Sequence, residues 1–293
     1  MRFAFLGPRG THSEEALRLM APLDVEPIPC ATVHEAIVAV RDGATDRAVV
    51  PIENSLEGSV AATLDTLAID APQVRIVAEE TLAIHHSLLA RCSLDLEEVK
   101  EVLSHPQALA QCARYLRERL PGAKQTATAS TAEGVRCVAE SERPWAAVGS
   151  RLAGELYGCA TLADRVEDAG DNLTRFVLLA PENDAAHARP LADEAEAGTR
   201  ALKTSIVFFG FNDVSPGALV AVLGELSSRG INLTKIESRP RRMGLGHYMF
   251  FADLEGGTSN AHVAEALDAL ARRVETLHVL GSYPASGAAE DPR

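Results

Sequence analysis

The chain has 293 residues, of which 46% are hydrophobic, so it can bury the cores of one large or two ordinary domains. Acidic residues outnumber basic residues by 41 to 28, and the resulting net charge of −13 disfavours binding to nucleic acid. No apolar run approaches the ~20 residues of a membrane span, and the amino terminus, MRFAFLGPRG, lacks the apolar stretch of a signal peptide.

Short apolar runs alternate with helical patterns through the first 182 residues. This alternation favours α/β architecture with a largely parallel sheet. Strands are predicted at 2–6, 46–51, 73–80, 99–103, 124–128, 145–149 and 173–180, and helices at 12–20, 57–68, 106–120 and 131–142.

The next segment, 183–202, is rich in Ala, Pro and charge and has no apolar period, so we expect a linker. Residues 203–285 then follow a βαββαβ order, which is the ferredoxin-like plan. Residues 286–293 are expected to form a frayed tail. The predicted elements are strands at 204–211, 231–238, 247–254 and 276–283, a helix that begins at Ser215-Pro216, and a helix near 260–273.

The five cysteines are widely scattered and form neither a CxxC pair nor a Cys/His cluster with zinc spacing. We therefore expect reduced and mostly buried thiols, no metal site and a cytoplasmic protein. The cysteines are Cys30, Cys92, Cys112, Cys137 and Cys159.

Several strings in the first 182 residues resemble the prephenate dehydratase family. They are GPRGTHSEEA (7–16), VVPIENSLEGSV (49–60), SHPQALAQC (104–112) and DNLTRFVLLA (171–180). Two later strings, SPGALVAVL (215–223) and RGINLTKIESRP (229–240), resemble the ACT regulatory domain that is fused to that family. One residue departs from the family pattern, because His12 stands where the family usually has an aromatic side chain.

The resemblance implies a bilobal, periplasmic-binding-protein-like catalytic domain over residues 1–182. Its lobes would comprise roughly 1–75 with 160–182, and 76–159. An α+β ferredoxin-like ACT domain would follow over 203–285. The chain resembles the monofunctional form of the family, since no helical extension precedes its first strand.

The same resemblance implies a reaction, the conversion of prephenate to phenylpyruvate in phenylalanine synthesis, without a metal or cofactor. Prephenate carries two carboxylates and a ring hydroxyl, and it loses carbon dioxide and water. The site must therefore bind anions, orient the substrate and supply a hydrogen-bond donor to the leaving hydroxyl. Arogenate dehydratase and a non-catalytic amino-acid-binding regulator are the alternative functions.

The family pattern places the catalytic residues at Thr174, Arg175, Asn54 and Ser55. Thr174 would donate to the departing hydroxyl, and Arg175 would hold a carboxylate through its planar guanidinium. On an alternating strand, however, Thr174 and Phe176 share one face and Arg175 takes the other. Both Thr174 and Arg175 can reach the substrate only if the strand bends or twists.

Further substrate contacts are predicted at Gly10, Thr11, Glu53, Asn172 and Phe176. Gly10 and Thr11 lie in a strand-to-helix loop, where backbone N–H groups can approach a carboxylate. An ordinary turn is the alternative for this loop. Glu53 follows an apolar strand, beyond whose carboxyl end ligands commonly bind.

Three histidine positions allow more than one interpretation. His85 and His86 lie where a strand is expected to pass between lobes, and a structural role is favoured over an acid role. His105 precedes Pro106 and is expected to help start a helix, on which Gln107 and Gln111 lie one turn apart.

The C-terminal residues are expected to bind phenylalanine as an allosteric effector between paired subunits of a homodimer or homotetramer. Glu237 would face the ammonium group of the effector, although a pair between Glu237 and Arg239 is the alternative. The predicted effector-binding residues are Gly217, Ala218, Leu219, Asn232, Leu233, Glu237 and Ser238.

Overall fold

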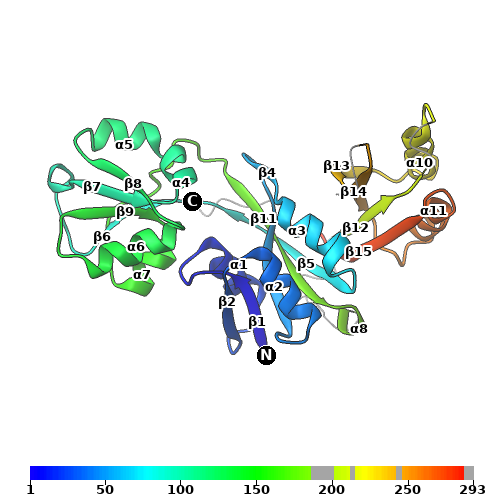
Figure 1. The fold of residues 1–293 in the computed structure, drawn as a ribbon, viewed down its shortest axis with the longest axis horizontal. Coiled ribbons are helices and arrows are strands. Elements are labelled where there is room, and N and C mark those ends of the chain that lie inside the picture. The colour runs from blue at the N-terminus through cyan, green and yellow to red at the C-terminus, as the bar shows by residue number, and fades with distance from the viewer. Residues whose placement is uncertain (186–200, 212–214, 242–245, 287–293) are drawn as a thin grey trace.

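The structure is a computed structural model that describes residues 1–185, 201–211, 215–241 and 246–286. Three β-sheets lie in a row along the long axis of the molecule (Figure 1). Two of them form a two-lobed domain, and the third belongs to the C-terminal domain. Among the described residues, no helix is long and apolar enough to cross a membrane.

The first lobe is built on a mixed sheet with the strand order β2-β1-β3-β11-β5, in which the short β4 also pairs with β3. Its strand β1 is buried on both faces, because Phe3 and Phe5 pack with helix α1 while Ala4 packs with helix α2. The elements are β1 (Arg2–Leu6), α1 (His12–Met20), β2 (Glu26–Cys30), α2 (Val33–Arg41), β3 (Arg47–Asn54), β4 (Gly58–Ser59), α3 (Ala61–Asp65), the π-helical η1 (Thr66–Asp70), β5 (Val74–Ala83) and β11 (Leu173–Pro181).

The second lobe has the strand order β10-β6-β9-β7-β8. Its helices begin at polar caps, since the side chains of Ser130 and Ser150 accept backbone N–H groups at the starts of α6 and α7. The elements are β6 (Ser87–Ala90), the 3₁₀ turn η2 (Leu96–Glu98), β7 (Glu101–Ser104), α4 (Pro106–Gln111), α5 (Ala113–Arg119), β8 (Lys124–Ala127), α6 (Thr131–Glu140), β9 (Trp145–Gly149), α7 (Arg151–Tyr157) and β10 (Ala160–Ala163).

The prediction of a largely parallel sheet is wrong. Strand β11 runs antiparallel to both β3 and β5, and β6 runs antiparallel to both β9 and β10. The cause is the path of the chain, which crosses to the second lobe after β5 and returns as β11 in the opposite direction. The predicted lobe boundaries at 75/76 and 159/160 also shift, because the crossings lie at 84–86 and 164–172.

The C-terminal domain confirms the predicted βαββαβ order. Its antiparallel sheet has the strand order β13-β14-β12-β15. A short helix, α8 (Glu182–Ala185), begins the predicted linker, most of which lies outside the described residues, as does the tail beyond Ser286. The elements are β12 (Leu202–Phe209), α10 (Ala218–Ser227), β13 (Leu233–Pro240), β14 (Tyr248–Glu255), α11 (Ala261–Ala271) and β15 (Thr276–Pro284).

The C-terminal sheet packs directly on the two-lobed domain. Helices α10 and α11 cover one face of the sheet, where Ile206 and Phe208 are buried. Side chains on its other face, Val207 and Phe251 among them, belong to one buried cluster with residues of the first lobe such as Ile52. The two domains therefore share a continuous hydrophobic core.

A glycine allows the backbones of the two domains to approach each other closely. A Cβ atom at Gly281 of β15 would collide with the carbonyl oxygen of Ile76 in β5. Overpacking of this kind usually costs about 1–3 kcal/mol. We therefore expect Gly281→Ala to lower the free energy of unfolding by about that amount, measured by urea denaturation.

Gly224→Ala is the matched control, because no atom lies within 4 Å of a Cβ built at this position in α10. Alanine is also the better helix former by about 1 kcal/mol. Equal effects of the two substitutions on stability would contradict the proposed close contact.

Candidate active site

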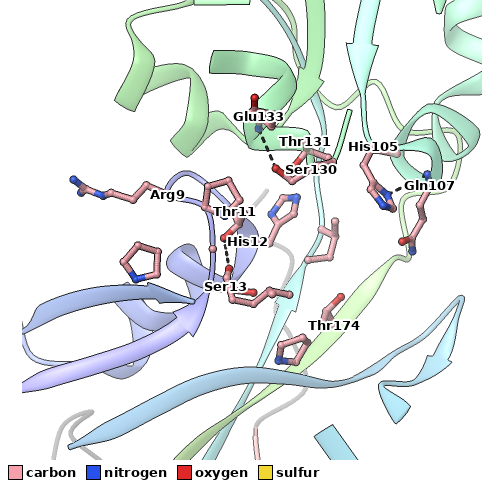
Figure 2. Close-up of a pocket in the computed structure, with 18 of the residues that line it drawn as sticks. Arg9, Thr11, His12, Ser13, His105, Gln107, Ser130, Thr131, Glu133 and Thr174 are labelled. Atoms are coloured by element: carbon pink, nitrogen blue, oxygen red, sulfur yellow. Dashed lines mark hydrogen bonds between the residues drawn. The ribbon is translucent and has the colours of Figure 1, made fainter. Parts of the chain in front are cut away.

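A cleft of about 1080 Å³ lies between the two lobes (Figure 2). This volume matches the space that sites for small organic ligands usually offer. The first lobe lines it with the loop before α1, the end of β3 and the start of β11, and the second lobe contributes the starts of α4 and α6. Figure 2 shows Thr174 on the side opposite Ser130 and Thr131.

Direct contacts join the lobes at one rim of the cleft. The hydroxyl of Ser150 donates to the carbonyl oxygen of Gly10 at 2.6 Å, and the hydroxyl of Tyr157 donates to that of Arg9 at 3.2 Å. Gly10 has φ +84°, and a Cβ at this position would lie 3.0 Å from Ala153. A glycine is therefore required where the first loop meets helix α7.

The structure brings five of the nine predicted catalytic and substrate-binding residues to the cleft: Thr11, Asn54, Asn172, Thr174 and Phe176. They come from the first loop, the end of β3 and the start of β11, where the chain re-enters the first lobe. Thr174 and Asn54 are cross-strand partners in the β11–β3 pair. The pairing of the strands thus places the two side chains together.

The orientation of Asn54 follows from its backbone contacts. Its Oδ1 accepts from the backbone N–H groups of Leu56 and Glu57, both at 3.0 Å. Its Nδ2 must therefore face the cleft side, where it donates to Thr174 Oγ1 at 2.8 Å and to Asn172 Oδ1 at 2.7 Å. Because Thr174 Oγ1 already accepts a hydrogen bond, its own proton is available for donation.

The same reasoning continues from Asn172 to His86. Since Asn172 Oδ1 is an acceptor, its Nδ2 donates to Gln111 Oε1 at 3.3 Å. The oxygen of Gln111 also lies 3.0 Å from His86 Nε2, so this ring nitrogen carries the proton. Neutral His86 consequently keeps a lone pair on Nδ1. Each group in the row from Thr174 to His86 thus has a defined hydrogen-bonding direction.

Two ring nitrogens at the cleft have no partner among the described residues. They are Nδ1 of His86 and Nε2 of His12, and the two rings meet edge to face with centroids 5.6 Å apart. Burial and the neighbouring His12 lower the pKa of His86 to about 4, against the opposing effects of Gln111 and Glu167. His86 is therefore a neutral hydrogen-bonding group at neutral pH.

The cleft offers anion-binding groups but little fixed positive charge. Among the described residues that line it, Arg9 is the one Lys or Arg. The first residues of α1 and α6 also reach the cleft, including Ser13 and Thr131. Helix N-termini attract anions because their N–H groups and dipoles point outward. The site can therefore hold carboxylates mainly through neutral donors.

Gly10, for which a substrate contact is predicted, does not itself line the cleft. Its backbone N–H donates to Glu14 Oε2 at 2.7 Å, so this group is already used inside the protein. Glu14 is buried, which alone would raise its pKa, but the N–H of Gly10 and the guanidinium groups of Arg18 and Arg9 lower it. Gly10 therefore shapes the loop, and the loop presents Thr11 to the cleft.

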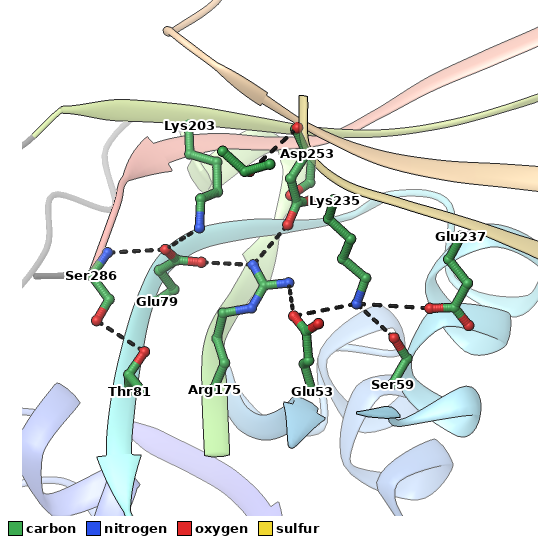
Figure 3. Close-up of polar contacts among 12 residues, drawn as sticks. Glu53, Ser59, Glu79, Thr81, Arg175, Lys203, Lys235, Glu237, Asp253 and Ser286 are labelled. Carbon is green, nitrogen blue, oxygen red and sulfur yellow. Dashed lines mark hydrogen bonds and ion pairs between the residues drawn. The ribbon is translucent and has the colours of Figure 1, made fainter. Parts of the chain in front are cut away.

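The expectation that Arg175 clamps a substrate carboxylate is not met. The strand does not twist enough to bring consecutive residues to one face, so Arg175 points away from the cleft toward the C-terminal domain (Figure 3). Its guanidinium lies 2.9 Å from each of three carboxylates, those of Glu53, Glu79 and Asp253. Burial would lower the pKa of Arg175, but these surroundings raise it.

Glu53 and Ser55 flank Asn54 and also lie outside the cleft lining. Glu53 pairs with Arg175, as described above. The hydroxyl of Ser55 accepts from the backbone N–H of Leu173 at 2.9 Å and donates to the carbonyl oxygen of Asp171 at 3.1 Å. These contacts fasten the turn after β3 to the start of β11, so both residues hold Asn54 and Thr174 in position.

Sequence reasoning did not assign substrate contacts to Arg9, His12, His86 or Gln111, all of which line the cleft. The sequence pointed to two of these residues, because Gln111 lies in a family string and His86 follows a predicted strand. The lining role of His86 required knowledge of the crossing at 84–86. The contact between His12 and His86 depends on how the lobes meet.

A second, smaller pocket of about 420 Å³ lies in the C-terminal domain. Three of the predicted effector-binding residues line it, namely Gly217, Ala218 and Leu219, and Gly217 caps α10 with φ +84°. The other four predicted effector residues do not line it: Asn232, Leu233, Glu237 and Ser238.

Strand alternation explains the placement of Glu237 in particular. It shares a face of β13 with Lys235 and Arg239, and its carboxylate lies 3.8 Å and 3.7 Å from their charged groups. Arg239 also forms a contact across the domain boundary, because its Nε donates to Asp65 Oδ1 at 2.6 Å. The alternative pairing of Glu237 with Arg239 is present in the structure, and contact of Glu237 with the effector ammonium between paired subunits stays a prediction.

The sequence matches known families over nearly its whole length. A family model described as prephenate dehydratase matches residues 3–184, and one described as the ACT domain matches residues 205–272. A curated prephenate dehydratase of Amycolatopsis methanolica is 42% identical over 282 residues, which cover 96% of this chain and 88% of that protein. One of Mycobacterium sp. (strain JLS) is 43% identical over 302 residues, covering 99% and 91%.

Two solved structures share the arrangement of both domains. The prephenate dehydratase of Arthrobacter aurescens in complex with L-Phe has a TM-score of 0.82 and 37% identity, covering 99% of this chain and 94% of that chain. GqqA, described as a novel type of quorum quenching acylase, has a TM-score of 0.82 and 33% identity, covering 98% of each chain. The fold described above is therefore shared along its full length.

The neutral state of His86 leads to a pH-dependent difference in stability. Between pH 6.5 and about 4, the unfolded chain binds a proton at His86 that the folded chain does not, so stability is lost as the pH falls. We expect the wild type to lose roughly 3 kcal/mol relative to His86→Gln across this window, measured by urea unfolding at several pH values. Glutamine retains an N–H for Gln111, and a constant difference in stability would contradict the assignment.

Proposed function

The chain belongs to the prephenate dehydratase family, and from this premise we propose that its cleft converts prephenate to phenylpyruvate while its ACT domain regulates the reaction by binding phenylalanine. The observation that carries the assignment of the reactive group is the hydrogen bond from Asn54 to Thr174. It leaves the proton of the Thr174 hydroxyl free inside a cleft of suitable size.

The reaction places a defined demand on this hydroxyl. The bond between the ring and its carboxylate breaks, its electron pair enters the ring, and the ring hydroxyl departs from the opposite carbon. One proton is consumed, because prephenate dianion becomes phenylpyruvate monoanion, carbon dioxide and water. Thr174 supports the departing oxygen by donating a hydrogen bond or relaying this proton, since a threonine hydroxyl is too weak an acid to act alone.

The remaining lining groups fit the rest of the substrate. Arg9 and the starts of α1 and α6 suit its two carboxylates. Asn172, Gln111 and His86 form a row of neutral polar groups that continues from Asn54 across the cleft. The row orients the substrate without adding charge next to the carboxylate that is lost.

We further propose that the chain acts as a homodimer or homotetramer joined through the ACT domain. Strand β13 is an edge strand, and Ile236 on it and Val220 on α10 are 47% and 72% exposed. A monomeric mass by light scattering would contradict this. A cytoplasmic location is supported by the five unpaired cysteines, which are stable in a reducing compartment.

The first test of function is phenylpyruvate formation from prephenate by the purified protein, without added metal or cofactor. We expect Thr174→Ala to lower kcat by about 100-fold or more, because general acid–base and donor contributions amount to 10²–10⁴-fold. Thr174→Ser retains the hydroxyl and should recover most of this loss. An unchanged kcat in the alanine variant would remove Thr174 from the reaction.

The substrate is tested in the same assay. Arogenate carries an amino group in place of the keto group of prephenate. Because the chain belongs to the prephenate dehydratase family, we expect a higher kcat/KM for prephenate than for arogenate. Hydrolysis of an acyl amide serves as the control activity, given the similarity to a structure described as an acylase. If the protein turned over arogenate and not prephenate, arogenate would be the substrate and the proposed reaction would be wrong.

The lining of the small ACT pocket indicates a substitution that should relieve inhibition by phenylalanine. Gly217→Val adds a side chain at the pocket and strains a backbone with φ +84°, so it should weaken phenylalanine binding at least about 10-fold and leave kcat intact. Calorimetry and inhibition curves measure the two effects. Gly224→Ala, farther along α10, is the control, and parallel loss of turnover and inhibition in Gly217→Val would argue against separate sites.

A further inference from the structure

Six charged side chains meet in the seam between the domains and form the interdomain ion cluster (Figure 3). The two-lobed domain contributes Glu53, Glu79 and Arg175, and the ACT domain contributes Lys203, Lys235 and Asp253. Glu237 of the ACT domain extends the cluster at Lys235, and the cations and carboxylates of the two domains meet only when the domains are docked.

The cluster is well buried and closely connected. The side chains of Arg175, Glu79 and Asp253 are 11%, 1% and 9% exposed. Lys203 Nζ lies 2.6 Å from Glu79, and Lys235 Nζ lies 3.4 Å from Glu53. Buried charges that lose a partner are strongly destabilised, so the position of each group depends on the others.

The cluster is joined to the cleft by one peptide unit. Thr174 and Arg175 are consecutive residues of β11 whose side chains lie on opposite faces of the sheet. The pairing of β11 with β3 shifts register between Arg175 and Phe176, so this part of the strand is locally irregular. A displacement of the Arg175 side chain can therefore alter the backbone that carries the Thr174 hydroxyl.

We propose that the Arg175–Asp253 ion pair is the contact through which the ACT domain controls the position of Thr174. Asp253 belongs to β14, one of the two inner strands of the ACT sheet, and its Oδ1 accepts from Ser205 of β12 at 2.6 Å. A change in the ACT sheet on effector binding moves Asp253, and Arg175 follows it. Arg175 is thus a positioning residue, and this inference rests on the proposed function.

Two of the three carboxylates around Arg175 come from the same domain as Thr174. They hold the arginine near its place when Asp253 is neutralised, so the basal reaction persists. What disappears is the dependence of its position on the ACT domain. Allosteric coupling is reciprocal, so the effect of the substrate on effector affinity is lost to the same degree.

Asp253→Asn tests this with little change in shape. We expect kcat and KM without phenylalanine to stay close to wild type, and phenylalanine to bind with unchanged affinity in calorimetry. The fold-inhibition by saturating phenylalanine should fall by at least about 5-fold, which is the lower end of typical allosteric coupling. Arg175→Lys cannot contact three carboxylates at once, so it should lose both coupling and roughly 10-fold in kcat with KM retained.

Asp65→Asn is the matched control. Asp65 is equally buried, at 9% exposed, and forms a close ion pair across the seam that does not involve Arg175, with Arg239 at 2.6 Å. It lies in α3 at the start of η1, away from β11, so this variant should keep full inhibition. Loss of inhibition in both variants would overturn the proposal, because either interdomain ion pair would then serve as well. Full inhibition in both variants would also overturn it, because neither ion pair would then carry the coupling.

A readout without turnover separates this inference from the proposed function. Backbone amides of residues 173–176 should exchange hydrogen faster in Asp253→Asn than in Asp65→Asn, even without any ligand. Should Asp253→Asn fail to fold, Ser205→Ala removes the hydroxyl that holds Asp253 while keeping every charge, and it should show the same loss of inhibition in part. Equal exchange in the variants would overturn the structural link, whereas wild-type protein inactive on prephenate would overturn only the assigned reaction.

Discussion

The two-residue period of strand β11 is the constraint on which the rest of the molecule depends. Because successive side chains alternate between faces, Thr174 must face the cleft when Arg175 faces the ACT domain. β11 is also the returning strand that joins the lobes, and it pairs on both sides with β3 and β5. One strand therefore fixes the Thr174 hydroxyl in the cleft and the Arg175 contact with the ACT domain together.

The seam between the domains combines two kinds of interaction with different consequences. Apolar contacts such as those of Val207 and Phe251 stabilise the docked domains but do not fix their relative orientation, since hydrophobic burial is non-directional. The ion cluster adds direction, because charges removed from water require partners at defined distances. Tyr283 illustrates how fully the seam is buried, since it is 1% exposed and burial together with Asp253 and Glu79 raises its pKa.

The fold was largely predictable where the pattern of a segment was self-sufficient. The βαββαβ order could be read from periodicity and caps, whereas β2, with two prolines in EPIPC, gives no strand signal and forms only because it pairs at a sheet edge. The family strings located Asn54, Asn172 and Thr174. They could not distinguish cleft residues from supporting ones, because Glu53, Ser55 and Arg175 act across strand pairs that the sequence does not reveal.

The scarcity of positive charge in the cleft suits the chemistry proposed for it. A cation held tightly against the carboxylate that leaves as carbon dioxide would stabilise the ground state more than the transition state, in which this charge moves into the ring. Arg9, whose side chain is half exposed and shares Glu14 with Arg18, is a moderate anchor for a carboxylate. Neutral groups such as Thr174, Asn172 and Gln111 line the cleft, and in the proposed reaction they would hold the substrate in place without opposing the movement of charge. An acidic protein can thus process a dianion by relying on oriented dipoles more than on net charge.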